Sequence, residues 1–269
     1  AFAGQKAATA PTAADEREPA EPAPSRPDAA DVDPQASGAK PSGLVRLTKD
    51  YDLWVDLKRK IVVVDGQVCL REGQLEMFAC PMGTKEHESV VSVNCKAQFV
   101  HAALLAVGAK PGTPVSFDPK YRAATGPEIE VIVLWKDQEG KKHQVRAQEW
   151  VRHLKTGKAM PYEWVFAGSG FWTDEQSGQR YYHGDAGDFI CVSNFPTATL
   201  DLPVESSQAN ADLLFEAFTE RIPPRGTEIR LVLRPKQEPR SAKGGAQEEG
   251  EQKDGEQKGG EQKGGEQES

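Results

Sequence analysis

A ten-residue stretch in the first half of the chain holds side chains that could carry out chemistry. Between Cys80 and Ser89 it carries a thiol, an ammonium, an imidazole, carboxylates and hydroxyls. A thiolate at Cys80 would be favoured beside Lys85 or His87, and would then be a nucleophile. Glu88 completes this set of four candidate catalytic residues. The alternative is a polar surface loop whose charges are solvated.

The same stretch has poor spacing for a metal site. Glu86-His87-Glu88 lacks the i, i+4 spacing that places two ligands on one helix face, and in a strand His87 would point away from both glutamates. The four cysteines contain no Cys-x-x-Cys pair, so the usual ligand spacing of zinc ribbons and iron–sulfur clusters is absent. We predict neither a resident metal nor another cofactor, although a metal held by His87 and nearby carboxylates stays an alternative.

The cysteines have different expected roles. Cys69 and Cys80 flank a short predicted hairpin that turns near Gly73, which could bring them close enough for a disulfide in an oxidising compartment. Cys95, in a predicted helix, and Cys191, in an apolar strand, are expected to be small buried hydrophobic residues.

A second group of candidates is aromatic and lies further along the chain. Trp172, Tyr182, His183 and Asp185 could form a platform for a flat or sugar-like ligand. Aromatic residues in this region could equally form the core of a β domain. His101, inside an apolar helix, is expected to be packed with one hydrogen bond satisfied.

The elements that must position these residues are mostly short strands. Asp65-Gly66 and Glu72-Gly73 separate apolar runs and predict hairpin turns. A polar connection between 129–135 and 143–150 predicts a second hairpin. We predict an α+β domain, mostly antiparallel β with one or two helices.

The clearest helix follows Asn94, its expected N-cap, and ends at Gly108. Its apolar residues fall on one face. The run at 213–218 could be helix or strand, because a short apolar run does not distinguish the two.

Composition divides the chain into three parts. Residues 1–43, rich in Ala, Pro and acidic residues, predict a disordered arm, and residues 236–269, with a Gly-Glu-Gln-Lys repeat, predict a disordered tail. Residues 44–235 between them predict a single globular domain. Each end carries a net charge of −3 out of the total of −8, so the domain itself is nearly neutral.

Charge and hydropathy argue against some classes of partner, and the first residues indicate a location. The absence of a basic stripe argues against nucleic-acid binding. No apolar run of eighteen or more residues is present, which argues against a membrane span. Ala1-Phe2-Ala3 has the pattern around a cleaved signal, so we expect an exported protein, periplasmic, extracellular or at the cell surface.

Several strings of residues are similar to those of a known family. They include Arg71-Glu72-Gly73, Phe78-Ala79-Cys80-Pro81, Gly83-Thr84-Lys85-Glu86-His87-Glu88-Ser89 and Ala147-Gln148-Glu149-Trp150. Together they resemble the YdjY-domain family, in the long form found in exported planctomycete proteins, over about 53–233. The resemblance implies no particular activity. A ferredoxin-like label attached to some members requires clustered cysteines, which this sequence lacks.

The sequence leaves three functions open. It most favours a non-enzymatic exported module that binds a protein, a small molecule or a saccharide, because no complete catalytic constellation is visible. The first alternative is a thiol- or metal-dependent enzyme that uses 80–89. The second is saccharide binding through exposed aromatic residues.

Overall fold

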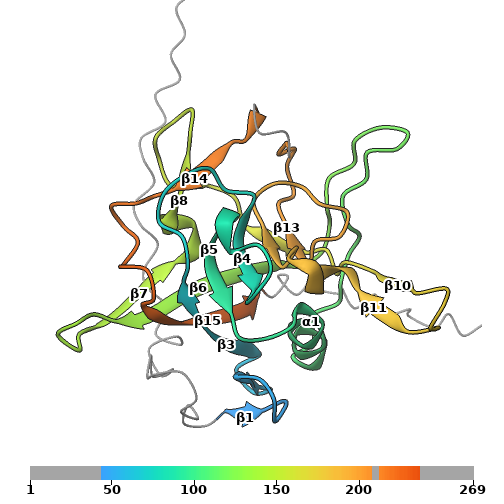
Figure 1. Cartoon of the computed structure of the whole chain (residues 1–269), viewed down its shortest axis with the longest axis horizontal. Coiled ribbons are helices and arrows are strands. Elements are labelled where there is room, and N and C mark those ends of the chain that lie inside the picture. The colour runs from blue at the N-terminus through green and yellow to red at the C-terminus, as the bar shows by residue number, and fades with distance from the viewer. Residues whose placement is uncertain (1–43, 208–211, 237–269) are drawn as a thin grey trace, which may run out of the picture. The chain divides into compact units, whose positions relative to one another are not determined.

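The structure, a computed structural model, describes residues 44–207 and 212–236. The predicted arms, 1–43 and 236–269, lie outside these residues except for Lys236. The described residues belong to one compact unit and are mostly β (Figure 1). The elements are β1 (Val45–Arg46), β2 (Leu53–Asp56), β3 (Ile61–Val68), β4 (Met77–Pro81), η2 (Glu86–Glu88), β5 (Ser89–Val93), α1 (Ala97–Ala106), β6 (Glu128–Lys136), β7 (Lys142–Arg146), η3 (Ala147–Trp150), β8 (Val151–His153), β9 (Trp164–Phe166), β10 (Phe171–Thr173), β11 (Arg180–Tyr182), η4 (His183–Ala186), β12 (Ile190–Cys191), β13 (Leu200–Asp201), β14 (Phe215–Ala217) and β15 (Glu228–Pro235).

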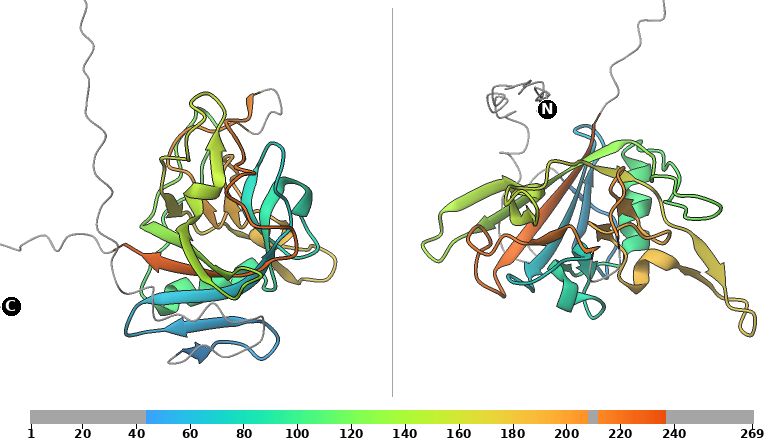
Figure 2. Two further views of the ribbon diagram at one scale, coloured as in Figure 1. Left: turned by 90° about the vertical axis from the view of Figure 1, so that its left-hand side faces the viewer. Right: turned by 90° about the horizontal axis from the view of Figure 1, so that it is seen from above.

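The main sheet closes on itself. In the order β3, β15, β6, β9, β13, β12, β4 and β5 each strand pairs with the next, and β5 pairs back with β3. β2 and β1 extend the sheet from β3, and β7 pairs with β6. In this sheet the pairings are antiparallel except for β4 with β5 and β12 with β13, which are parallel. The prediction of a mostly β fold is therefore confirmed, and Figure 2 shows the strands from two further sides.

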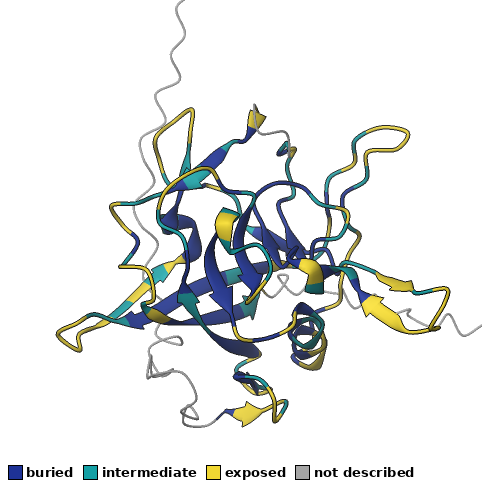
Figure 3. Ribbon diagram, in the orientation of Figure 1, coloured by how far each residue is buried: buried dark blue, intermediate teal, exposed yellow. Residues whose placement is uncertain are grey.

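The long strands β6 and β15 are buried on both faces, as Figure 3 shows. Leu231 belongs to the main core cluster inside the closed sheet, whereas its neighbour Val232 belongs to a second cluster that includes Trp54 and Leu44. Successive side chains of a strand point to opposite faces, so each strand serves both clusters. Burying one such aliphatic side chain stabilises the fold by about 1.5–3 kcal/mol.

A buried ion pair accompanies the second cluster. Arg230 of β15 binds Asp65 of β3 through two hydrogen bonds of 2.5 and 2.8 Å, and the side chains are 2% and 3% exposed. The Arg230 guanidinium also lies 5.1 Å from the centroid of the Trp54 ring. Because Asp65 pairs with Arg230 within the ladder, the pair fixes the register of β3 against β15.

The predicted hairpin turn at Asp65-Gly66 is wrong. β3 runs through both residues, and Gly66 pairs with Val93 of β5. A Cβ at Gly66 would lie 2.4 Å from the backbone oxygen of Ser92, so this glycine allows two strands to approach closely. Asp65 is thus explained by its ion pair and Gly66 by the close approach of two strands. In the sequence, the same two residues are also the pattern of a turn.

The second predicted hairpin is confirmed, since β6 and β7 pair antiparallel from Ile132↔Arg146 to Lys136↔Lys142. The predicted helix is α1, and its apolar face packs on the main cluster, but its N-cap is Lys96 and the prediction of Asn94 is wrong. The undecided run at 213–218 contains the strand β14. Among the described residues, no helix is long and apolar enough to cross a membrane.

Candidate functional site

The segment from Cys80 to Ser89 is a short loop between two parallel strands. Cys80 lies in β4 and Ser89 begins β5, with the single turn η2 between them. Gly83 has a φ of 82°, which glycine adopts without strain. The Thr84 hydroxyl donates a hydrogen bond of 2.6 Å to the carbonyl oxygen of Pro81. The loop therefore folds back over the end of β4.

Cys80 lies inside the protein and is 0% exposed. Cys69, the residue that follows β3, lies across β5 from it. The Cys69 sulfur also lies 3.0 Å from the carbonyl oxygen of Ser89. The expected hairpin between the two cysteines is wrong, because β5 lies between β3 and β4. Both are free thiols in the structure, and a disulfide between them stays a prediction.

The pKa values of the two thiols are shifted in opposite directions. The neighbouring Cys69 thiol is the main cause that lowers the pKa of Cys80, against the effect of burial, and Ser89 and Thr84 lower it further. The Cys80 thiol, followed by burial, raises the pKa of Cys69.

Lys85 fastens the loop to another part of the chain. Its Nζ atom lies 3.3 Å from Glu88 and 3.1 Å from Asp188, which precedes β12. Burial alone would lower the pKa of Lys85, but the carboxylates of Asp188 and Glu88 outweigh it and raise that pKa. The ammonium also lies 4.7 Å from the centroid of the Phe195 ring.

His87 lies apart from Cys80. Its side chain is 76% exposed, and its Nε2 atom lies 3.8 Å from the Glu88 carboxylate. The structure thus brings Lys85 and Glu88 together, with His87 on the surface and Cys80 in the interior. The catalytic set of four remains a prediction. Within residues 44–207 and 212–236, no three or more His, Cys, Asp and Glu side chains form a group that could hold a metal.

The hairpin of β10 and β11 projects from the main sheet, and Figures 1 and 3 show most of it exposed. Trp172 pairs with Tyr181 across the two strands, and the rings stack with centroids 4.8 Å apart and an angle of 22°. They are 44% and 40% exposed. Phe171 is also exposed, and the Arg180 guanidinium lies 4.7 Å from the centroid of its ring.

Tyr182 points the opposite way, into the core. Its hydroxyl lies 2.9 Å from Nδ1 of His101 and 3.1 Å from both the Gly168 carbonyl oxygen and the Thr199 hydroxyl. Burial raises the pKa of Tyr182 and lowers that of His101. The arrangement matches the packed histidine expected from the sequence, and it gives Tyr182 a structural role.

His183 and Asp185 lie in η4, next to the hairpin, where each contacts the backbone. The His183 N–H donates a hydrogen bond of 2.9 Å to the Gly170 carbonyl oxygen, and its side chain is half-buried. Asp185 accepts one of 2.9 Å from the Gln98 N–H in the first turn of α1. Lys96 at the start of α1 forms no side-chain cap, so Asp185 caps the helix from outside. Of the four residues predicted to bind a ligand, Trp172 has an exposed ring, Tyr182 is buried, and His183 and Asp185 are half-buried.

Sequence reasoning missed Tyr181, whose ring is exposed beside that of Trp172. Tyr181 and Tyr182 are adjacent in a strand, so one faces outward and the other inward. The sequence alone does not show which. The only available signal was the alternation of polar Arg180 and apolar residues over a run too short to fix its register.

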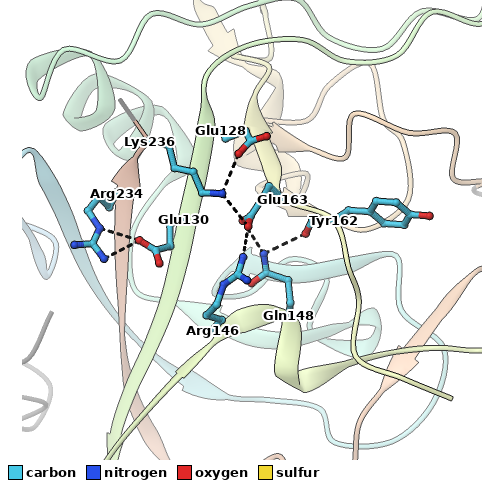
Figure 4. Close-up of polar contacts among 8 residues, drawn as sticks. All are labelled: Glu128, Glu130, Arg146, Gln148, Tyr162, Glu163, Arg234 and Lys236. Atoms are coloured by element: carbon cyan, nitrogen blue, oxygen red, sulfur yellow. Dashed lines mark hydrogen bonds and ion pairs between the residues drawn. The ribbon is translucent and has the colours of Figure 1, made fainter. Parts of the chain in front are cut away.

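A polar network around Glu163 was also missed (Figure 4). Glu163 contacts Arg146, Gln148 at 3.0 Å and Lys236 at 3.0 Å. Burial alone would raise the pKa of Glu163, but Lys236 and Arg146 lower it overall. Lys236 also pairs with Glu128 at 2.9 Å. The network ties the residue after β15 to β6 and β7, and we assign it a structural role.

Comparison with known proteins fits the resemblance in sequence. The model of the YdjY domain matches residues 53–234, more than half of the chain. The chain belongs to the YdjY-domain family. The match begins at β2 and ends in β15, so the family's domain includes the closed sheet, the Cys80 loop and the β10–β11 hairpin. Neither the curated proteins nor the solved structures gave a match.

Proposed function

We propose that this YdjY domain is a non-enzymatic binding module whose ligand contacts the β10–β11 hairpin. The observation that carries the proposal is the stacked and exposed pair of Trp172 and Tyr181. β10 and β11 pair as a separate two-stranded sheet, and neither ring belongs to a core cluster of the described residues. Large aromatic side chains exposed together are typical of interaction sites.

A saccharide is the ligand class that fits this surface best. The apolar face of a sugar ring packs on a flat aromatic ring, while its hydroxyls need nearby polar groups. Gln179, whose Oε1 accepts a hydrogen bond of 3.1 Å from the Tyr181 hydroxyl, provides such a group. A stable protein interface buries about 800 Å² on each partner, which is more than two partly exposed rings offer.

The proposal includes the predicted export of the protein, because envelope and extracellular polysaccharides lie outside the cytoplasm. It is preferred to the enzymatic alternative because Cys80 is covered while His87 is on the surface. A nucleophile and its base must come within hydrogen-bond reach to act together.

The test is binding of the full chain to a glycan array, followed by calorimetric titration of the strongest ligand. We expect Trp172→Ala and Tyr181→Ala each to weaken binding by about tenfold or more, which corresponds to about 1.4 kcal/mol. Phe117→Ala is the matched control, since Phe117 is an exposed ring outside the hairpin and its removal should leave the affinity unchanged. No bound glycan, or an equal loss in the control, would contradict the proposal.

A further inference from the structure

A cavity lies between the loop that joins α1 to β6 and the segments that flank β13. It has a volume of about 470 Å³, within the range of sites that hold small molecules. None of the described residues that line it belongs to the β10–β11 hairpin or to the Cys80 loop, so it is a separate site. Figure 1 shows the loop between α1 and β6 in green at the upper right. The lining residues are Phe117, Pro196, Glu205, Ser206 and Ser207.

The aromatic ring of the cavity is positioned by a short ladder within its loop. Ser116 and Arg122 pair in an antiparallel bridge, through backbone hydrogen bonds of 3.1 and 2.8 Å. Successive side chains of an extended segment point to opposite faces, so Phe117 and Tyr121 share the face away from Arg122. The two rings have centroids 5.9 Å apart. Phe117 lines the cavity and is 50% exposed, so part of its ring is available to a ligand.

Asn194 joins the two segments that form the cavity. Its Oδ1 atom accepts hydrogen bonds from the Ser206 N–H at 2.7 Å and from the Tyr121 hydroxyl at 3.3 Å. The Ser206 hydroxyl in turn donates a hydrogen bond of 2.6 Å to the Val192 carbonyl oxygen. These contacts fix the walls of the cavity relative to each other, which lowers the cost of ordering them around a ligand.

The charges at the cavity are negative. Among the described residues that line it, Glu205 alone is charged, and its exposed carboxylate forms neither a hydrogen bond nor an ion pair with them. Behind this wall, Asn194 donates a hydrogen bond of 3.1 Å to Oδ1 of Asp201, whose buried Oδ2 has no partner in the part of the chain that the structure describes. Burial, followed by the charges of Asp201 and Glu205, raises the pKa of Tyr121 to about 12. A cation is therefore attracted to this surface.

We propose that this cavity binds the ammonium group of a small organic cation, with the Phe117 ring and the Glu205 carboxylate as its two main contacts. The face of an aromatic ring attracts an ammonium group, and a carboxylate adds a charge of the opposite sign. The apolar part of the cation packs on Pro196, which also lines the cavity. An anion would meet Glu205 without a basic group in the lining, and a neutral molecule would gain nothing from the charge.

The test is titration of the isotope-labelled full chain with choline and with ethanolamine, followed through its amide NMR signals. The two probes share the ammonium group and differ in its methylation, and saturable binding of either one at the cavity supports the proposal. Dimethylbutanol, in which carbon replaces the charged nitrogen of choline, should bind at least about tenfold more weakly than choline. If neither cation saturates the signals of the lining residues, or if the neutral analogue binds as well as choline, the proposal is overturned.

Two variants at exposed positions identify the contacts. Glu205→Gln removes the charge and Phe117→Leu removes the ring but keeps apolar bulk, and each should weaken binding of the cation by about tenfold. Glu139→Gln is the matched control, because it removes the same charge from an exposed residue between β6 and β7. An equal loss in this control would show general attraction to an acidic protein and would overturn the site. Trp172→Ala should leave binding of the cation unchanged, so this proposal and the glycan proposal fail independently.

Discussion

Asp201 is a carboxyl group at the end of β13 that is buried among apolar strands. Burial raises its pKa to about 7, even though Asn194 and the Leu202 N–H donate hydrogen bonds of 3.1 and 2.8 Å that act in the opposite direction. In the unfolded chain an aspartate has a pKa of about 3.9. The folded protein therefore holds this proton more tightly than the unfolded chain does.

The stability that protonated Asp201 contributes is complete below about pH 4 and is lost as the pH rises through about 7. We expect Asp201→Asn, which mimics the neutral acid, to remove this loss. Between pH 5 and pH 8 the free energy of unfolding of the unaltered protein should fall relative to the variant by on the order of a few kcal/mol. Urea unfolding at both pH values measures the difference. If the stabilities of the unaltered protein and the variant depend on pH in the same way, the raised pKa of Asp201 is wrong.

At the scale of elements, the approach of β5 to β3 depends on the absence of a side chain at Gly66. A Cβ there would lie 2.4 Å from the backbone oxygen of Ser92, which cannot move away without displacing β5. The same strand carries Ser89 and Ser92, which are both buried. Its placement therefore determines how β3 and β4 are joined in the closed sheet.

We expect Gly66→Ala to destabilise the protein by about 1–3 kcal/mol, the usual cost of overpacking a closely fitted position. Gly170→Ala is the matched control, because the added methyl group would lie at an ordinary contact distance of 3.5 Å from His183. Thermal unfolding of the two variants measures the contrast. If both lose the same stability, the close approach of the strands does not explain the glycine.

Sequence reasoning succeeded for elements with a long and regular pattern, such as the β6–β7 hairpin and the buried face of α1. It failed where a tertiary contact has the same residue pattern as a turn, as at Asp65-Gly66. For the candidate site, it predicted a hairpin between Cys69 and Cys80, whereas β5 lies between β3 and β4. It could not show which of two adjacent tyrosines faces water, because a one-residue shift reverses a strand's faces.

For the whole molecule, the described core needs residues on both sides of the family match. Leu44 belongs to the second cluster, and Lys236 joins Glu128 and Glu163. Both lie outside 53–234, the residues matched by the YdjY domain. The unit that folds independently should therefore be slightly longer than that match.

We expect a chain shortened to 44–236 to fold and to unfold thermally at nearly the same temperature as the full chain. Shortening it to 53–234 should lower the midpoint by several degrees, since removing Leu44 uncovers Trp54, and about 1 kcal/mol corresponds to about 2–4 °C at this size. Scanning calorimetry compares the three chains. Failure of 44–236 to fold would show that the domain needs further residues.

The number of paired residues differs greatly between neighbouring strands of the closed sheet. β6 and β15 pair over seven positions, whereas β12 and β13 meet at the single pair Ile190↔Leu200, with an irregular register beside it. A closed sheet opens locally where two strands share the fewest hydrogen bonds. Amide hydrogens near β12 should therefore exchange with deuterium well before those of β15. Because β12 is also paired to β4, the strand that carries Cys80, opening between β12 and β13 should loosen β4 before the long strands β6 and β15.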